Sequence, residues 1–189
     1  MDTFHTEMKS RKVKILGISG SLRANSSAGA VLKVVGDWLP EYVDFKIFTG
    51  IGDMPAFDDR QELPLTVKNF IQEILDADAV FFCIREYAFG VPGSLKNALD
   101  WTVSSTAFSE KPVALITAAS QGEKAHASMS LTLGALGAGI SEETKLLISF
   151  IKTKLDEKGK LPDQNVLNSI RSVIQALLLK VEASIVTHR

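Results

Sequence analysis

Short hydrophobic runs of strand length recur along the chain, and the segments between them have a different period. Five such runs lie at residues 13–18, 43–48, 79–84, 112–117 and 145–150. The first, third and fourth are apolar almost throughout, which is typical of parallel strands that helices cover on both faces. The pattern therefore predicts five strands in a largely buried sheet.

Between these runs, apolar residues recur three and four positions apart, as they do on the core-facing side of a helix. The clearest stripe consists of Val67, Phe70, Ile71, Ile74 and Leu75. Similar stripes lie within residues 31–38, 95–102 and 166–177. Strands that alternate with helices specify an α/β fold with a doubly wound parallel sheet and right-handed crossovers. With five strands, we predict the flavodoxin-like order 2-1-3-4-5, with helices on both faces.

Two connections are longer than the usual loop, at residues 49–64 and 152–162. We interpret the first as a surface loop near the ligand or a subunit contact, and the second as a solvated turn. Composition does not shift across either connection. We therefore predict a flexible tail at residues 1–12 and one domain at residues 13–189.

Composition and charge remove several classes of function. A chain of 189 residues that is 46% hydrophobic can bury a core without disulfides, and its net charge of −1 gives no field that attracts nucleic acid. No apolar stretch approaches the roughly 20 residues that span a bilayer, and residues 1–12 lack the apolar region of a signal peptide. The single cysteine, Cys83, lies in an apolar run and indicates a reducing, cytoplasmic location.

The connection after the first predicted strand has the composition of an anion-binding loop. Ligands of doubly wound sheets bind at the carboxyl ends of the strands, where the strand order reverses. Gly20 allows an anion to approach the backbone closely, and Arg23 offers a positively charged guanidinium with several N–H donors. The N-terminus of the following helix also favours an anion. Hydroxyl donors are supplied by Ser21, Ser26 and Ser27. Taken alone, the same residues are equally consistent with an ordinary helix cap and turn.

Other catalytic and metal-binding motifs are not complete in this chain. There is no Gly-Lys-Ser/Thr of a P-loop, and Gly17 with Gly20 does not complete G-x-G-x-x-G. Near matches to a nucleophile elbow have no acid and histidine placed with them. The histidines are scattered, at His5, His126 and His188, so we predict no metal site, and for His126 we predict a solvated or capping role.

Two segments resemble the family of NADPH-dependent FMN reductases. Residues 14–23 read Lys-Ile-Leu-Gly-Ile-Ser-Gly-Ser-Leu-Arg, with Ser26 following, and resemble that family's G-S-x-R-x-x-S loop. Residues 91–101 read Val-Pro-Gly-Ser-Leu-Lys-Asn-Ala-Leu-Asp-Trp, follow Glu86-Tyr87, and resemble its second signature. Both segments have the order and spacing of the family.

The resemblance implies a flavodoxin-like domain that binds FMN and takes hydride from NADPH or NADH. By this likeness, the phosphate would be held by Ser19, Ser21, Arg23 and Ser26, with Ser27 beside them. The flavin ring would lie between two loops, which contribute Glu86, Tyr87, Ala88 and Gly90 after the third strand and Ser120, Gln121 and Gly122 after the fourth. Because hydride passes to the flavin itself, the protein mainly orients the ring and needs no catalytic side chain.

The implied activity is an NAD(P)H-dependent oxidoreductase that reduces a small-molecule acceptor, namely free flavin, a quinone or an azo compound. The family also implies a homodimer or homotetramer, with Trp101 interpreted as a helix-packing residue beside a subunit contact. An alternative from a different class is a non-catalytic flavodoxin-like electron carrier or FMN-binding module. The near-neutral charge of this chain favours the reductase, since electron-carrier flavodoxins are strongly acidic. A third alternative is a relative that has lost flavin.

The chain departs from the family pattern at three positions. Arg85 and Ala88 stand where Pro and Asn are common, and Ala28 stands where Asn is frequent. Arg85 admits two interpretations: its charge lies near the flavin edge or a nicotinamide phosphate, or it is an exposed arginine paired with Glu86 or another carboxylate. All three departures bear on the affinity for FMN.

Overall fold

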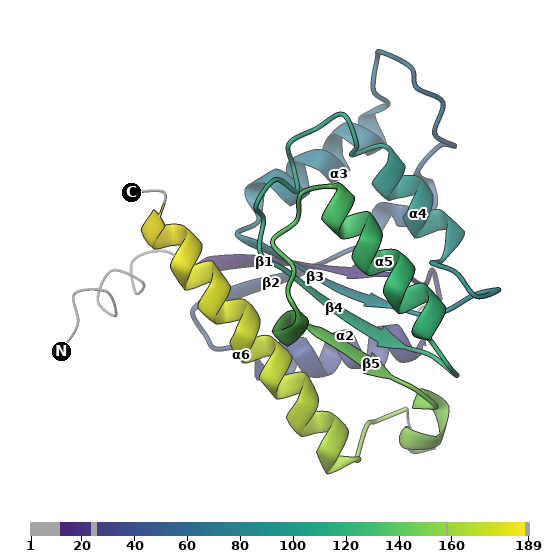
Figure 1. Cartoon of the computed structure of the whole chain (residues 1–189), viewed down its shortest axis with the longest axis vertical. Coiled ribbons are helices and arrows are strands. Elements are labelled where there is room, and N and C mark those ends of the chain that lie inside the picture. Colours follow the sequence, from purple (N-terminus) through teal and green to yellow (C-terminus); the bar gives the residue numbers. More distant parts are fainter. Residues whose placement is uncertain (1–11, 24–25, 158, 188–189) are drawn as a thin grey trace.

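Five parallel strands form one sheet in the order β2-β1-β3-β4-β5 (Figure 1). The computed structural model describes residues 12–23, 26–157 and 159–187. The strands are β1 (Val13–Ser19), β2 (Val43–Phe48), β3 (Ala79–Ile84), β4 (Val113–Ala118) and β5 (Lys145–Ile148). Every pair of neighbouring strands is parallel, with Ile15 opposite Phe45 in β2 and opposite Ala79 in β3. The predicted fold class and strand order are confirmed.

Helices cover both faces of this sheet (Figure 1). The side chains of α2 (Ser27–Trp38) and α6 (Gln164–Thr187) share one core cluster. The opposite cluster is formed by α3 (Leu65–Asp76), α4 (Gly93–Asp100) and α5 (Glu123–Ala135). Short 3-10 helices lie in the connections: η1 (Gly50–Asp53), η2 (Glu142–Thr144) and η3 (Ile151–Lys154).

The central strand β3 shows why its sequence is apolar throughout. Its side chains alternate between the two core clusters, so that Phe81 and Cys83 pack toward α2 and α6 while Phe82 and Ile84 pack toward α3, α4 and α5. Each fully buried side chain of this size contributes roughly 1.5–3 kcal/mol of transfer free energy. Burial also raises the pKa of the Cys83 thiol, so this cysteine is a core residue and not a nucleophile.

Three sequence-based expectations are wrong in detail. Leu75, predicted to face the core, is 45% exposed, because a position eight residues after Val67 lies about 80° around the helix from it. The last strand ends at Ile148 because Phe150 has a left-handed backbone with φ of 55°. The connection at residues 152–162 is not simply solvated, since Leu161 is buried in the core.

Some expectations concern residues outside the described part of the chain. Of the predicted tail at residues 1–12, the structure describes only Lys12, which is exposed. His5 and His188 lie outside the described residues. Within the described residues, no helix has both the length and the apolar character needed to cross a membrane.

Candidate functional site

The loops after β1, β3 and β4 meet at the carboxyl edge of the sheet, where the strand order reverses between β1 and β3. The Gly20 N–H donates to the carbonyl oxygen of Cys83 at 2.9 Å. The Ser27 hydroxyl donates to the carbonyl oxygen of Ala118, at the end of β4, at 3.3 Å. These two bonds join the predicted phosphate loop, at residues 19–27, to the ends of β3 and β4.

The phosphate loop is held largely by hydrogen bonds within itself. The Ser21 N–H donates to the Ser19 hydroxyl at 3.1 Å, and the Arg23 N–H donates to the Ser21 hydroxyl at 3.3 Å. Ser26 caps α2 by accepting from the Gly29 N–H at 3.0 Å. The capping interpretation of Ser26 is therefore correct, but a hydroxyl that accepts in this way still has a proton to donate to an anion.

Gly20 is required by the close approach of this loop to β3. A β carbon at position 20 would lie 3.1 Å from both the α and β carbons of Ile84. Since the obstacle includes backbone, a larger residue would push the loop away from the strand. The departure at Ala28 has a different explanation, because Ala28 is fully buried in the core cluster beneath α2, where an apolar side chain fits.

A cavity of about 400 Å³ opens beside the phosphate loop. Its lining includes Ser19, Ser21 and Arg23 from that loop and Thr49 and Ile51 from the next connection. The connection at residues 49–64 therefore reaches the candidate ligand site, one of the two locations expected for it. Sequence patterns did not single out Thr49 or Ile51, because their position depends on how η1 packs against the sheet.

After β3, the chain makes a tight turn from Tyr87 to Gly90. The Tyr87 N–H donates to the Gly90 carbonyl oxygen at 3.1 Å, and the Gly90 N–H donates back to Tyr87 at 2.9 Å. The two central residues, Ala88 and Phe89, have φ of 47° and 60°. Positive φ at both central positions is characteristic of a type I′ turn, which favours Asn and Gly. The departure at Ala88 therefore leaves a strained residue where Asn would be relaxed.

Glu86 connects the loop after β3 to the start of α5. Its carboxylate accepts from the N–H groups of Gly122 at 3.3 Å and Ala125 at 3.0 Å. Gly122 has no side chain with which to cap the helix, so Glu86 supplies the missing acceptor from another loop. No ion pair joins Glu86 to Arg85, and the expected pairing of these two residues is wrong.

The loop after β4 is fixed by the segment that follows β5. The carbonyl oxygen of Ser120 accepts from the Phe150 N–H at 3.1 Å, and that of Gln121 accepts from the Ser149 hydroxyl at 2.8 Å. The side chains of Ser120 and Gln121 are exposed at the carboxyl edge. Sequence reasoning missed Ser149 and Phe150 because the apolar run at 145–150 indicated only a strand.

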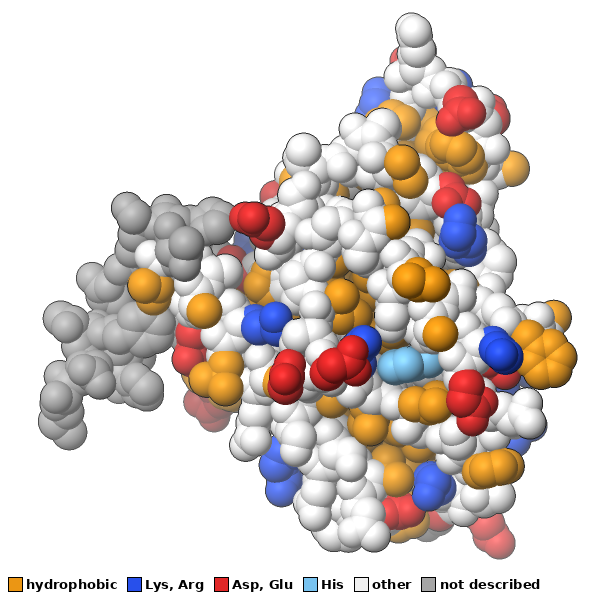
Figure 2. Space-filling view, in the orientation of Figure 1, with side chains coloured by type: hydrophobic (Ala, Val, Ile, Leu, Met, Phe, Trp, Pro, Cys, Tyr) orange, Lys and Arg blue, Asp and Glu red, His pale blue; other side chains and the backbone are white. Residues whose placement is uncertain are grey.

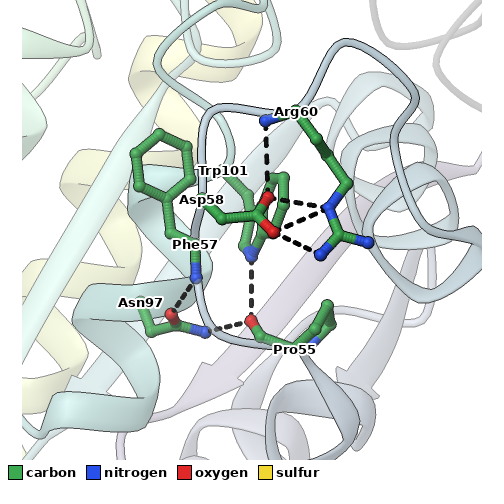
Figure 3. Close-up of polar contacts among 6 residues, drawn as sticks. All are labelled: Pro55, Phe57, Asp58, Arg60, Asn97 and Trp101. Atoms are coloured by element: carbon green, nitrogen blue, oxygen red, sulfur yellow. Dashed lines mark hydrogen bonds and ion pairs between the residues drawn. The ribbon is translucent and has the colours of Figure 1, made fainter.

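The second signature holds the long connection against α4 (Figure 3). The Asn97 carboxamide accepts from the Phe57 N–H at 2.9 Å and donates to the Pro55 carbonyl oxygen at 2.8 Å. Trp101 Nε1 donates to the same carbonyl at 3.0 Å, and its ring meets the Phe57 ring edge-on with centroids 5.1 Å apart. Trp101 is buried, so its packing role is confirmed, and one helical turn of the signature fixes the base of the connection.

His126 is half-exposed, and instead of capping α5 it contacts a residue of β4. Its Nδ1 lies 2.8 Å from the hydroxyl oxygen of Thr117 in β4. Burial lowers the pKa of His126, and the positive charge of Lys145 lowers it further. The residues that the structure describes contain no group of three or more His, Cys, Asp or Glu that could hold a metal ion.

The fold is that of a flavodoxin-type domain, with the predicted phosphate loop at the reversal of strand order. The residues present fit the phosphate of FMN: hydroxyls of Ser19, Ser21 and Ser26, the exposed guanidinium of Arg23, the N-terminus of a 12-residue helix, and the close passage of Gly20. The buried Nε of Arg85 has no hydrogen-bond partner among the described residues.

Comparison with known proteins identifies the family. The family model for NADPH-dependent FMN reductases matches residues 13–152, and the chain belongs to that family. An NAD(P)H-dependent FMN reductase of Pseudomonas aeruginosa is 32% identical, over 89% of this chain and 95% of that protein. A quinone reductase of Escherichia coli K12 is 27% identical, over 88% of this chain and 94% of its own length.

A solved structure agrees on the fold. The flavoenzyme FerB of Paracoccus denitrificans, an NAD(P)H:(acceptor) oxidoreductase, superposes with a TM-score of 0.79 at 23% identity. The match covers 90% of this chain and 98% of FerB. The family predicted from the two sequence segments is confirmed.

Proposed function

We propose that this protein is an FMN-dependent NAD(P)H oxidoreductase that passes electrons to a small acceptor such as free flavin, a quinone or an azo compound. The observation that carries this proposal is the phosphate loop packed against the ends of β3 and β4 in a member of the FMN reductase family. The two relatives named above are an FMN reductase and a quinone reductase. This favours the reductase over a non-catalytic electron carrier.

In this proposal the chain supplies binding and orientation. Ser19, Ser21, Arg23 and Ser26 hold the phosphate of FMN, while Ser27 fixes the loop to β4. The turn at residues 87–90 and the loop formed by Ser120, Gln121 and Gly122 would flank the flavin ring. Bound FMN supplies the chemistry, accepting hydride from NADPH or NADH and passing on its electrons.

No side chain of the described residues is assigned a proton-transfer role. Cys83 is buried within β3, and burial raises the pKa of its thiol. His126 is engaged by Thr117, and its lowered pKa favours a neutral imidazole at neutral pH. The proposal therefore rests on the positions of backbone and hydroxyl donors and not on an acid-base pair.

We also propose a homodimer or homotetramer in the cytoplasm. Exposed Phe57 and Val103 line a cavity of about 330 Å³ between the long connection and α4, and hydrophobic side chains are visible on this upper part of the surface (Figure 2). Such a surface suits a second copy of the chain. The single thiol, Cys83, supports a reducing compartment.

The first test is the visible absorption spectrum of the protein after FMN is added and the excess removed. We expect retained flavin bands that bleach rapidly when NADPH is added without oxygen. Retained bands that stay oxidised would favour the electron carrier instead. Loss of all flavin would contradict the proposal that FMN is a resident cofactor.

A further inference from the structure

Arg85 is the first residue beyond the contact between the phosphate loop and β3. The Gly20 N–H bonds to the carbonyl of Cys83, and the α carbon of Gly20 packs beside Ile84. Arg85 follows Ile84 directly, so its backbone lies at the edge of the candidate ligand site. Arg85 is therefore part of the loop after β3, the strand whose end the phosphate loop contacts through Gly20.

The Arg85 guanidinium has no carboxylate partner within the described part of the chain. Its Nε is buried and has no hydrogen-bond partner there, and no ion pair found there includes it. The nearest carboxylate in sequence, that of Glu86, accepts from Gly122 and Ala125 instead. A guanidinium stays charged and carries five N–H donors, so burying one of them without an acceptor costs free energy.

The ring of Tyr87 contacts the guanidinium of Arg85 without accepting a hydrogen bond from its buried Nε. The guanidinium carbon of Arg85 lies 5.6 Å from the centroid of the Tyr87 ring, within the range of a cation–π contact. Tyr87 is itself fixed by the paired hydrogen bonds to Gly90. The turn therefore places an aromatic ring beside a planar group of N–H donors, and such a group is suited to bidentate binding of an anion.

We propose that Arg85 is an anion-binding residue whose acceptor is a phosphate group of a bound ligand. This inference rests on the proposed function, which supplies two phosphate-bearing ligands, FMN and the nicotinamide cofactor. Both offer the same chemistry, a phosphate that accepts two parallel N–H bonds. Arg85 thereby extends the phosphate-binding surface beyond Arg23 and the serine hydroxyls.

The test measures dissociation constants for ligands with and without the relevant phosphate. FMN and riboflavin are titrated against apoprotein by flavin fluorescence, and NADP⁺ and NAD⁺ are titrated against FMN-loaded protein by calorimetry. The variants are Arg85→Gln, which removes the charge, and Arg85→Lys, which keeps it as a point charge. The matched control is Arg171→Gln, since Arg171 stacks on Trp38 at the far end of α2, 4.7 Å from the ring centroid.

We expect Arg85→Gln to weaken at least one phosphate-bearing ligand about tenfold, which corresponds to 1.4 kcal/mol, and riboflavin less than twofold. A loss confined to FMN assigns the cofactor phosphate. A loss confined to NADP⁺ assigns the 2′-phosphate, and equal losses for NADP⁺ and NAD⁺ assign the diphosphate. Arg85→Lys should retain part of the affinity, and the salt dependence of binding should decrease in Arg85→Gln.

A purely structural arginine would give a different result. It would lower the melting temperature and weaken riboflavin as much as FMN, and that outcome overturns the proposal. Changes within twofold for every ligand, matching Arg171→Gln, overturn it as well. If wild-type protein binds neither FMN nor NADP⁺, the proposed function has failed, which the wild-type titrations reveal separately.

Discussion

The loop after β1 and the two loops after β3 and β4 are stabilised in different ways. Hydrogen bonds within the first loop join residues two or three positions apart, as from Ser19 to Ser21 and from Ser26 to Gly29. The other two loops also depend on bonds between residues 28 to 39 positions apart, as from Glu86 to Ala125 and from Ser149 to Gln121. The predicted phosphate loop therefore combines local hydrogen bonds with two attachments to the sheet, at Gly20 and Ser27. The loops after β3 and β4 depend on long-range bonds to each other and to the segment after β5.

The same regions also differ in backbone strain. Within the described residues of the first loop, no residue has positive φ, whereas Ala88, Phe89 and Phe150 all do at the carboxyl edge. Phe89 and Phe150 are also 70% and 63% exposed. Residues with strained backbone conformations cluster at functional sites, where the rest of the fold maintains the costly geometry. The described residues of the phosphate loop lack this strain, whereas the loops after β3 and β4 are held in place by the rest of the fold.

The largest effect is expected from Gly20→Val, which breaks the contact of the local loop with β3. Its new β carbon would lie 3.1 Å from the Ile84 backbone, so the loop must move. We expect FMN affinity to fall about 100-fold and stability to fall by about 1–3 kcal/mol. The matched control is Gly134→Ala in α5, where an added β carbon would meet no atom within 4 Å outside its own helix backbone and chain neighbours. Near wild-type affinity in Gly20→Val would show that the loop does not bind FMN in this conformation.

Glu86→Ala is expected to break the long-range connection while leaving the phosphate loop intact. Removing the acceptor of two N–H groups at the start of α5 should cost about 1–3 kcal/mol of unfolding free energy, measured with urea. Riboflavin and FMN should lose affinity equally, because the phosphate loop is unchanged. Glu123→Ala, an exposed residue in the first turn of the same helix, is the control, and an equal cost in both variants would argue against the cap.

Ala88→Asn tests the strain in the turn from Tyr87 to Gly90. Because Asn tolerates the left-handed region better than Ala, we expect stability to rise by about 1 kcal/mol, seen as a higher melting temperature. Ala88→Gly should act in the same direction. Ala127→Gly, at an exposed position within α5, should instead lower stability by about 0.5–1 kcal/mol. A stability loss in both Ala88 variants would mean that the turn is not strained.

The smallest effect is expected from His126, which links β4 to α5 behind the ring-facing loops. Its pKa is lower in the folded protein than in the unfolded chain, so its contribution to stability is full above the unfolded pKa. That contribution is lost as the pH falls through the folded pKa, and it amounts to a few tenths of a kcal/mol for this half-exposed group. His126→Gln should flatten the stability profile between about pH 7.5 and pH 5. An unchanged profile would assign that pH dependence to other groups.

The sequence by itself determined the elements, the strand order and the family. Apolar runs such as residues 79–84 predict buried strands, because every side chain of a strand covered on both faces lies in the core. The Ser-Gly-Ser-Leu-Arg loop and the string at residues 91–101 are contiguous, so their chemistry is visible without a structure. Each depends on residues that are neighbours in the chain.

Only the tertiary structure decided how the functional side chains are used. Glu86 caps a helix 36 to 39 residues away, and Asn97 with Trp101 binds a carbonyl at Pro55, more than 40 residues earlier. Arg85 is left without a described acceptor because its neighbouring carboxylate is already engaged. Hydrogen-bond partners of this kind depend on which strands lie side by side. A linear pattern of polar and apolar residues does not specify which distant segments come together.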